Sequence, residues 1–176
     1  MPKFILLAAV SLDGRITRGN EEGTEWTSMD DKRFFERELD NFDAVIMGRG
    51  TFEAIEPPLK PRNRIVFTHS PLFQSSVEHW NSAGPIVPFS GTSARLLKLL
   101  KMHGWKRVAI LGGTSIYDWF LKRGLIDEMY LTLEPVIFGT GKALASVALE
   151  SLTTFKLLST KKLNSQGTLL LHYKVN

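Results

Sequence analysis

The sequence contains no cysteine. This absence excludes a disulfide framework, cysteine-based zinc or iron–sulfur sites and thiol catalysis, and it suits the reducing cytoplasm, where we expect the protein to reside. No apolar run approaches the roughly 20 residues of a membrane-spanning helix, so we expect no membrane association. We predict that residues 4–12 form a buried strand and not a signal peptide, because the apolar run is short and Asp13 and Arg15 follow it directly.

The sequence also has only a small excess of charge of one sign. The 22 Lys and Arg residues exceed the 18 Asp and Glu residues by only four, which gives a formal net charge of +4 at pH 7. This mild excess helps to attract an anionic cofactor or substrate. The basic residues are scattered and form no recognition helix or basic arm, so we expect no nucleic-acid partner. The four histidines show no ligand spacing, and we expect no metal site.

The pattern of apolar residues predicts an α/β protein. The chain has 176 residues and neither a repeat nor a long linker, so we expect one domain over residues 1–176. Predicted strands at residues 4–12, 43–47, 64–68, 85–89 and 107–111 alternate with predicted helices that begin near Ser28, near Ser93 and after Gly113. Strands that are almost wholly apolar and alternate with helices are typical of a parallel sheet covered on both faces.

The last third of the sequence has a different character. Residues 155–163 and 168–175 flank the turn-forming segment Asn-Ser-Gln-Gly at positions 164–167. This arrangement predicts an antiparallel hairpin. The expected sheet is therefore mixed, mostly parallel at first and antiparallel at the C-terminal end.

Two glycine turns follow predicted buried strands. Gly-Arg-Gly-Thr at residues 48–51 follows one strand, and Gly-Gly-Thr at residues 112–114 follows another. Free amides at the start of the next helix favour a phosphate, and an arginine adds a bidentate clamp. The carboxyl ends of parallel strands share one edge of the sheet, where open α/β sheets bind ligands. For each turn taken alone, a tight turn without a ligand remains the alternative. The candidate phosphate-binding residues are Gly48, Arg49, Gly50, Thr51, Gly112, Gly113, Thr114, Ser115 and Ile116.

These motifs resemble the dihydrofolate-reductase-like superfamily over nearly the full length, and most closely the reductase domain of riboflavin biosynthesis. Residues 45–53 (Val-Ile-Met-Gly-Arg-Gly-Thr-Phe-Glu) resemble the strand–turn–helix that binds NADPH phosphates. Residues 11–16 (Ser-Leu-Asp-Gly-Arg-Ile) resemble the opening signature of the riboflavin-pathway domain, and residues 124–128 and 135–139 resemble later stretches of it. Leu111 departs from that family, which usually has Glu before its glycine pair.

The resemblance implies a three-layer α/β/α dihydrofolate-reductase-like fold, NADPH as the cofactor and a homodimer. It implies reduction of 5-amino-6-(5-phosphoribosylamino)uracil or a closely related riboflavin-pathway compound. The alternatives are a reductase of a pterin or another small substrate, and a catalytically silent nucleotide-binding protein. The candidate catalytic residues are Asp13 and Asp31, and the candidate substrate-binding residues are Ser28, Trp26 and Arg62.

Local chemistry leaves simpler interpretations open for these residues. Arg62 is also explained as a solvated arginine in a loop. Asp13 is equally well explained as the aspartate of an Asp-Gly turn. Asp31 is suited to the first turn of a helix because the helix dipole favours an acidic residue there, and Ser28 is suited to the cap.

Overall fold

The computed structural model describes residues 1–21, 23–55, 63–70, 73, 85–150 and 152–176. Within this part, the strands are β1 (Lys3–Val10), β2 (Ala44–Gly48), β3 (Arg64–Phe67), β4 (Ile86–Phe89), β5 (Arg107–Ile110), β6 (Glu128–Leu133), β7 (Phe155–Lys162) and β8 (Leu169–Val175). The helices are α1 (Met29–Leu39), α2 (Arg49–Ala54), α4 (Ser93–His103) and α5 (Thr114–Leu121). None of the helices described is long and apolar enough to cross a membrane.

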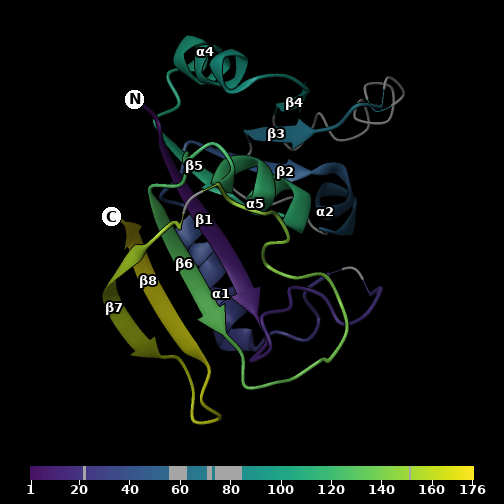
Figure 1. Ribbon diagram of the computed structural model, residues 1–176, viewed down its shortest axis with the longest axis vertical. Coiled ribbons are helices and arrows are strands. Elements are labelled where there is room, and N and C mark those ends of the chain that lie inside the picture. The colour runs from purple at the N-terminus through teal and green to yellow at the C-terminus, as the bar shows by residue number, and fades with distance from the viewer. Residues whose placement is uncertain (22, 56–62, 71–72, 74–84, 151) are drawn as a thin grey trace.

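One sheet of eight strands runs through the molecule in the order β4-β3-β2-β5-β1-β6-β8-β7 (Figure 1). Neighbouring strands from β4 to β6 are parallel, whereas β8 is antiparallel to both β6 and β7. The predicted mixed sheet with an antiparallel C-terminal hairpin is therefore confirmed. Strand β4, which contains Pro88, lies at the edge of the sheet, where a residue without a backbone N–H is tolerated.

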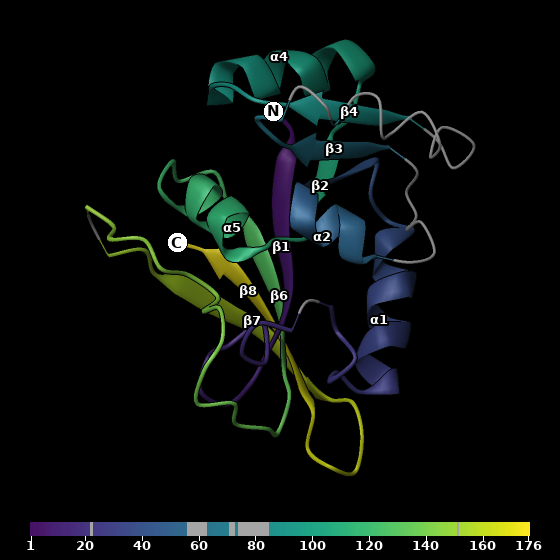
Figure 2. The ribbon, with the colours of Figure 1, turned by 90° about the vertical axis from the view of Figure 1, so that its right-hand side faces the viewer.

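Helices cover the two faces of the sheet in separate groups (Figure 2). On β1, Phe4 and Leu6 pack with side chains of α4 and α5, whereas Ile5 and Leu7 pack on the opposite face with side chains of α1 and α2. This division follows from the alternation of side chains along a strand, and it requires central strands that are apolar on both faces. The three-layer α/β/α fold is confirmed.

The ends of the helices follow the local sequence. Ser28 precedes α1, and its side chain accepts a hydrogen bond from Asp31 N at 3.2 Å, as a capping serine does. Helix α4 begins at Ser93, as predicted, but the capping side chain is that of Thr92. The helix ends at Gly104, where φ is 70°, a left-handed conformation that glycine adopts without steric cost.

The predicted end of the first strand is wrong. Strand β1 ends at Val10 and not at residue 12, because Ser11 N donates to Arg15 O at 2.9 Å and closes a turn. Leu12 lies on this turn and is exposed. Helix α1 ends at Leu39, and Phe42 is buried in the connection that leads to β2.

Candidate functional site

A cleft of about 1160 Å³ lies at the carboxyl ends of the parallel strands. Residues at the ends of β1, β2, β5 and β6 line it, together with residues of α1, α2 and α5. Pockets for single small ligands usually occupy about 300–1,000 Å³. The cleft is therefore large enough for two ligands side by side, such as a dinucleotide and a small substrate.

The two glycine turns meet in this cleft. Strands β2 and β5 are parallel neighbours, and Gly48 N donates to Gly112 O at 2.8 Å. Helix α2 leaves the first turn toward one face of the sheet, and α5 leaves the second turn toward the other face. Adjacent strands whose helices diverge in this way open a crevice at the sheet edge, which is where doubly wound folds bind ligands. The prediction that both turns lie at one edge is confirmed.

Glycine is required at position 112 by the backbone and by its neighbour. The φ angle of Gly112 is 96°, and a Cβ there would lie 2.7 Å from Tyr117 Cζ. Tyr117 itself is held in place, since its hydroxyl donates to Leu7 O at 2.8 Å in the buried core. Gly50 differs, because a Cβ at that position would meet no atom within 4 Å. Packing therefore does not explain Gly50, whose missing side chain leaves space at the wall of the cleft.

The residues of the second turn fit a phosphate-bearing ligand. Gly113 is the N-cap of α5 and makes no side-chain capping hydrogen bond. Gly113, Thr114 and Ser115 line the cleft, so the uncapped start of the helix lies at its wall. Amides at such a helix start bind anions. The Thr114 hydroxyl donates to Ala143 O and is engaged in holding the loop that follows β6.

Arg49 brings positive charge to the first turn. Its side chain is half-exposed and lies at the cleft, with Nε 3.4 Å from Glu53 Oε1 one helical turn later. An exposed pair of this kind contributes about 0–1 kcal/mol, so it competes weakly with a bound phosphate. Thr51 also lines the cleft, and a Cβ on Gly113 would lie 3.8 Å from Thr51 Oγ1. Together the two turns provide amides, a hydroxyl and a guanidinium in one place.

Asp31 is a buried carboxyl in the same cleft. It lies in the first turn of α1, and the side chains of Thr132 and Thr27 interact with its carboxyl. Burial raises the pKa of the Asp31 carboxyl, and the nearby charge of Glu134 raises it further, while the two threonines and Lys32 lower it. A carboxyl whose pKa is raised keeps its proton to a higher pH, which suits a proton donor.

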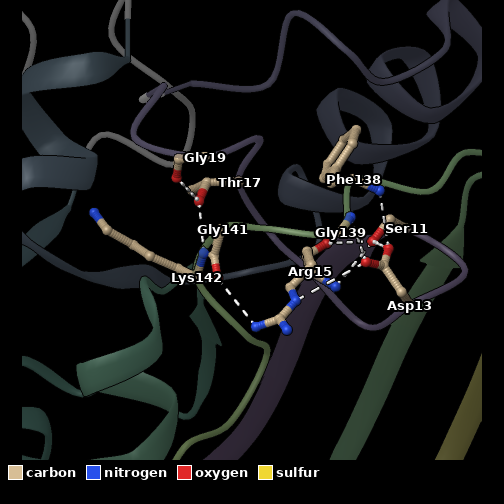
Figure 3. A network of polar contacts seen from close by, with 9 residues as sticks. All are labelled: Ser11, Asp13, Arg15, Thr17, Gly19, Phe138, Gly139, Gly141 and Lys142. Carbon is tan, nitrogen blue, oxygen red and sulfur yellow. Dashed lines mark hydrogen bonds and ion pairs between the residues drawn. The ribbon is translucent and has the colours of Figure 1, made fainter.

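Asp13 has the opposite environment (Figure 3). Its carboxylate accepts hydrogen bonds from Ser11 Oγ at 2.6 Å, Phe138 N at 3.2 Å and Gly139 N at 2.8 Å. The hydrogen bond from Ser11, followed by those from the two backbone amides, lowers the pKa of Asp13 to about 2 despite partial desolvation. Asp13 is not among the residues that line the cleft. Its contacts are those of an anchor between the turn after β1 and the segment after β6.

The same pair of segments is joined at further points along the cleft wall. Ile16 N donates to Lys142 O at 2.8 Å, and Lys142 N donates to Thr17 Oγ1 at 2.9 Å. Arg15 Nη1 donates to Gly141 O at 3.1 Å (Figure 3). Ile16, Thr17 and Lys142 all line the cleft. The anchored segments therefore form part of the cleft wall.

The structure describes two of the three remaining candidates, Ser28 and Trp26. Ser28 caps α1 beside Asp31, and Trp26 packs edge-on against Phe138 with ring centroids 5.0 Å apart. Neither is among the lining residues. Arg62 lies outside the described residues.

Three residues that act on Asp31 are not among the candidates from the sequence. They are Thr27, Thr132 and Glu134. The available signal was the spacing of Thr132 and Glu134, because residues two apart on a strand face the same way. That spacing does not reveal which helix the face meets.

A three-layer α/β/α arrangement whose central sheet has this strand order, with two glycine turns at its carboxyl edge, is a dihydrofolate-reductase-like fold. The chain belongs to the family of the RibD C-terminal domain, whose family model matches residues 2–169. The expected family is thereby confirmed.

Relatives of known sequence and structure agree with this assignment. The chain is 33% identical to the uncharacterized protein YwjB of Bacillus subtilis (strain 168) over 186 residues, which cover 97% of each protein. It shares its fold with a deaminase/5-amino-6-(5-phosphoribosylamino)uracil reductase of Thermotoga maritima, with a TM-score of 0.81 and 18% identity over 99% of this chain and 57% of that one. The dihydrofolate reductase of Enterococcus faecalis complexed with NADP(H) has a TM-score of 0.72 and 20% identity, over 99% of this chain and 96% of that one.

The two glycines provide a test of the site geometry. We expect Gly112→Ala to lower the free energy of unfolding by about 1–3 kcal/mol, because the new Cβ collides with the Tyr117 ring and φ is positive. The matched variant Gly50→Ala meets no neighbour and lies in α2, so it should be neutral or stabilising by up to about 1 kcal/mol. Urea unfolding of both variants measures the difference, and equal losses would contradict the arrangement of the two turns.

Proposed function

We propose that this protein is an NADPH-dependent reductase of a nitrogen-containing compound, with 5-amino-6-(5-phosphoribosylamino)uracil or a closely related riboflavin-pathway intermediate as the first candidate substrate. The observation that carries the proposal is the presence of a buried acid, Asp31, in the same cleft as the two glycine turns. Membership of the RibD C-terminal domain family supports the reductase activity and the substrate class.

The proposed chemistry divides between cofactor and protein. NADPH, when bound, supplies a hydride, that is, a proton with an electron pair, to the electrophilic carbon of a C=N bond. Asp31 donates its proton to the nitrogen of that bond, so C=N becomes CH–NH, and Asp31 then takes a proton from solvent. The side chains of Thr27 and Thr132, which both lower the pKa of Asp31, would help to hold the carboxyl in place. The glycine turns and Arg49 would hold the phosphates, and the anchored segment that carries Ile16 and Thr17 would keep water from the reacting atoms.

A pterin is the second candidate substrate. Phe34 and Phe35 of α1 line the cleft near Asp31, which provides an apolar wall for a flat ring beside a carboxyl that can bind ring nitrogens. The fold shared with the Enterococcus faecalis dihydrofolate reductase supports this alternative. A protein that binds the nucleotide without catalysis is the third alternative, and turnover distinguishes it from the first two.

The decisive experiment follows NADPH absorbance while the ribosylaminopyrimidine phosphate and dihydrofolate are offered separately. We expect NADPH oxidation with the pyrimidine, at a rate well above the rate without substrate. Turnover with dihydrofolate alone would replace the first candidate with the second. Binding of NADPH without oxidation by either compound, or by a wider set of pterins, would leave the silent binding protein.

The role of Asp31 predicts a pH dependence. Because the pKa of Asp31 is raised and a donor acts in its protonated form, kcat should fall as pH rises through that pKa. We expect Asp31→Asn to lower kcat by about 10²–10⁴-fold, to abolish this alkaline fall and to change NADPH affinity by less than about twofold. Asp30→Asn is the control, since Asp30 is the neighbouring carboxylate, pairs with Arg33 and does not line the cleft. A similar loss of kcat in both variants would argue against Asp31 as the donor.

The role of Arg49 predicts a preference between cofactors. If its guanidinium contacts the additional phosphate of NADPH, Arg49→Ala should weaken NADPH binding about 10- to 100-fold and NADH binding by about twofold. Arg33→Ala serves as control, because Arg33 is an exposed arginine outside the cleft lining. Fluorescence titration measures both affinities. Equal weakening of NADPH and NADH would assign Arg49 to the shared pyrophosphate, and no weakening would remove it from the site.

The proposal includes a homodimer, as the family resemblance implies. Strand β7 is an edge strand whose side chains are almost all exposed, among them Leu157 and Leu158. An exposed edge with apolar side chains is suited to pairing with a second copy. Light scattering at micromolar concentration tests this part of the proposal, and a monomeric mass would contradict it.

A further inference from the structure

A second buried carboxylate, that of Glu134, lies at the end of β6. Glu134 is only 3% exposed to solvent, and it has no role in the proposed mechanism. Ser28 N donates to Glu134 Oε1 at 2.8 Å, and Thr168 Oγ1 donates to Glu134 Oε2 at 2.7 Å. Both oxygens thus accept a hydrogen bond, as those of an ionised carboxylate do. Burial of such a group is costly unless its hydrogen bonds are made, so this arrangement calls for an explanation.

Glu134 is connected to Asp31 through the start of α1. Glu134 holds the backbone N–H of Ser28, and the side chain of Ser28 in turn accepts a hydrogen bond from Asp31 N at 3.2 Å. Two residues before Glu134, the side chain of Thr132 also interacts with the Asp31 carboxyl and lowers its pKa. The end of β6 therefore contacts the acid directly through Thr132 and fixes its helix through Glu134.

The other oxygen of Glu134 is tied to the C-terminal hairpin. Thr168 is buried beside β8, and its hydroxyl accepts a hydrogen bond from Asn164 Nδ2 at 2.9 Å. Asn164 Oδ1 also accepts from Thr168 N at 3.1 Å, which closes the turn between β7 and β8. The Thr168 hydroxyl thus accepts from Asn164 with one lone pair and donates its proton to Glu134. The turn therefore positions the hydrogen-bond donor of Glu134 Oε2, while Ser28 N serves Oε1.

Few charges act on Asp31 besides Glu134. On α1, Lys32 is the neighbouring cation, and its ammonium lies 3.9 Å from the exposed carboxylate of Glu25. The loop before α1 and strand β6 contribute the hydroxyls of Thr27 and Thr132. Glu134 is thus the negative charge on the strand side of Asp31, and Lys32 is the positive charge on the helix side. The partial positive charge at the N-terminus of α1 helps to stabilise Glu134 in its buried position.

We propose that Glu134 is a positioning residue for Asp31, which it serves in two ways. Through Ser28 it fixes the first turn of the helix that carries Asp31, and through its buried negative charge it favours the protonated form of the Asp31 carboxyl. The functional consequence rests on the proposed role of Asp31 as proton donor. The structural consequence does not, because it concerns the ligand-free protein.

The test compares two substitutions that separate charge from anchoring. Glu134→Gln keeps the length and an oxygen that accepts from Ser28 N, but removes the charge. Glu134→Asp keeps the charge but withdraws the carboxylate by one methylene and releases Ser28. The first readout is a ¹³C NMR titration of aspartate carboxyls in the ligand-free protein, in which the Asp31 signal is assigned from its absence in Asp31→Asn. The second readout is hydrogen exchange of the Asp31 and Lys32 amides.

We expect Glu134→Gln to move the Asp31 midpoint to lower pH and to leave amide exchange near that of the unchanged protein. We expect Glu134→Asp to keep the midpoint high and to accelerate exchange at the start of α1. In the reductase assay, the alkaline fall of kcat should move to lower pH in Glu134→Gln, with about tenfold less activity for each pH unit by which it moves, while KM for NADPH is unchanged.

An unmoved Asp31 midpoint in folded Glu134→Gln would overturn the electrostatic part, and unmoved exchange in Glu134→Asp would overturn the anchoring part. If Glu134→Gln does not fold, Glu134→Asp still decides the anchoring part. Absence of turnover with every substrate, combined with the expected NMR result, would reject the proposed function and leave this inference standing.

Discussion

The hydrogen bond from Gly48 N to Gly112 O joins the two turns on which the site depends. It extends the parallel pairing of β2 with β5 from the last residue of β2 to a residue beyond the end of β5. Helices α2 and α5 leave the two turns toward opposite faces of the sheet, so a crevice lies between them. This hydrogen bond lies at the base of that crevice. A side chain on Gly112 would displace Tyr117, and Tyr117 is bonded to β1 through Leu7. The two turns, β1 and α5 are thus linked through Gly112 and Tyr117.

Two aspartates near the cleft show how environment divides chemically identical groups. Asp13 accepts three hydrogen bonds and stays ionised, so it acts as a fixed tie between two segments of chain. Asp31 is buried, faces another carboxylate and has a raised pKa, so it is suited to hold a proton. The same pair of residue types thus supplies a structural anchor and a candidate acid. Desolvation and hydrogen bonding, not residue type, assign the two roles.

The sheet could be predicted to a large extent because its elements have local signatures. Strand β5 and the C-terminal hairpin lie within one or two residues of their predicted ranges, since apolar runs and turn residues mark them clearly. The end of β1 was placed two residues too late, because Leu12 prolongs the apolar pattern while the Ser11–Arg15 turn interrupts the strand. Periodicity reports which residues are apolar, and it does not report where a competing hydrogen bond ends an element.

Some features of the candidate site could also be predicted from the sequence, and others could not. From the sequence alone came the two glycine turns at strand ends, the capping role of Ser28 and the family, because each depends on residues close together in the chain. Only the tertiary structure decided that Asp31 is buried beside Thr132 and Glu134 and that Asp13 is turned to another segment. Ser28 and Glu134 are 106 positions apart, and strand pairing across the sheet brings them together. A proton affinity is set by burial and by charges from distant strands, so it is defined only once those strands have paired.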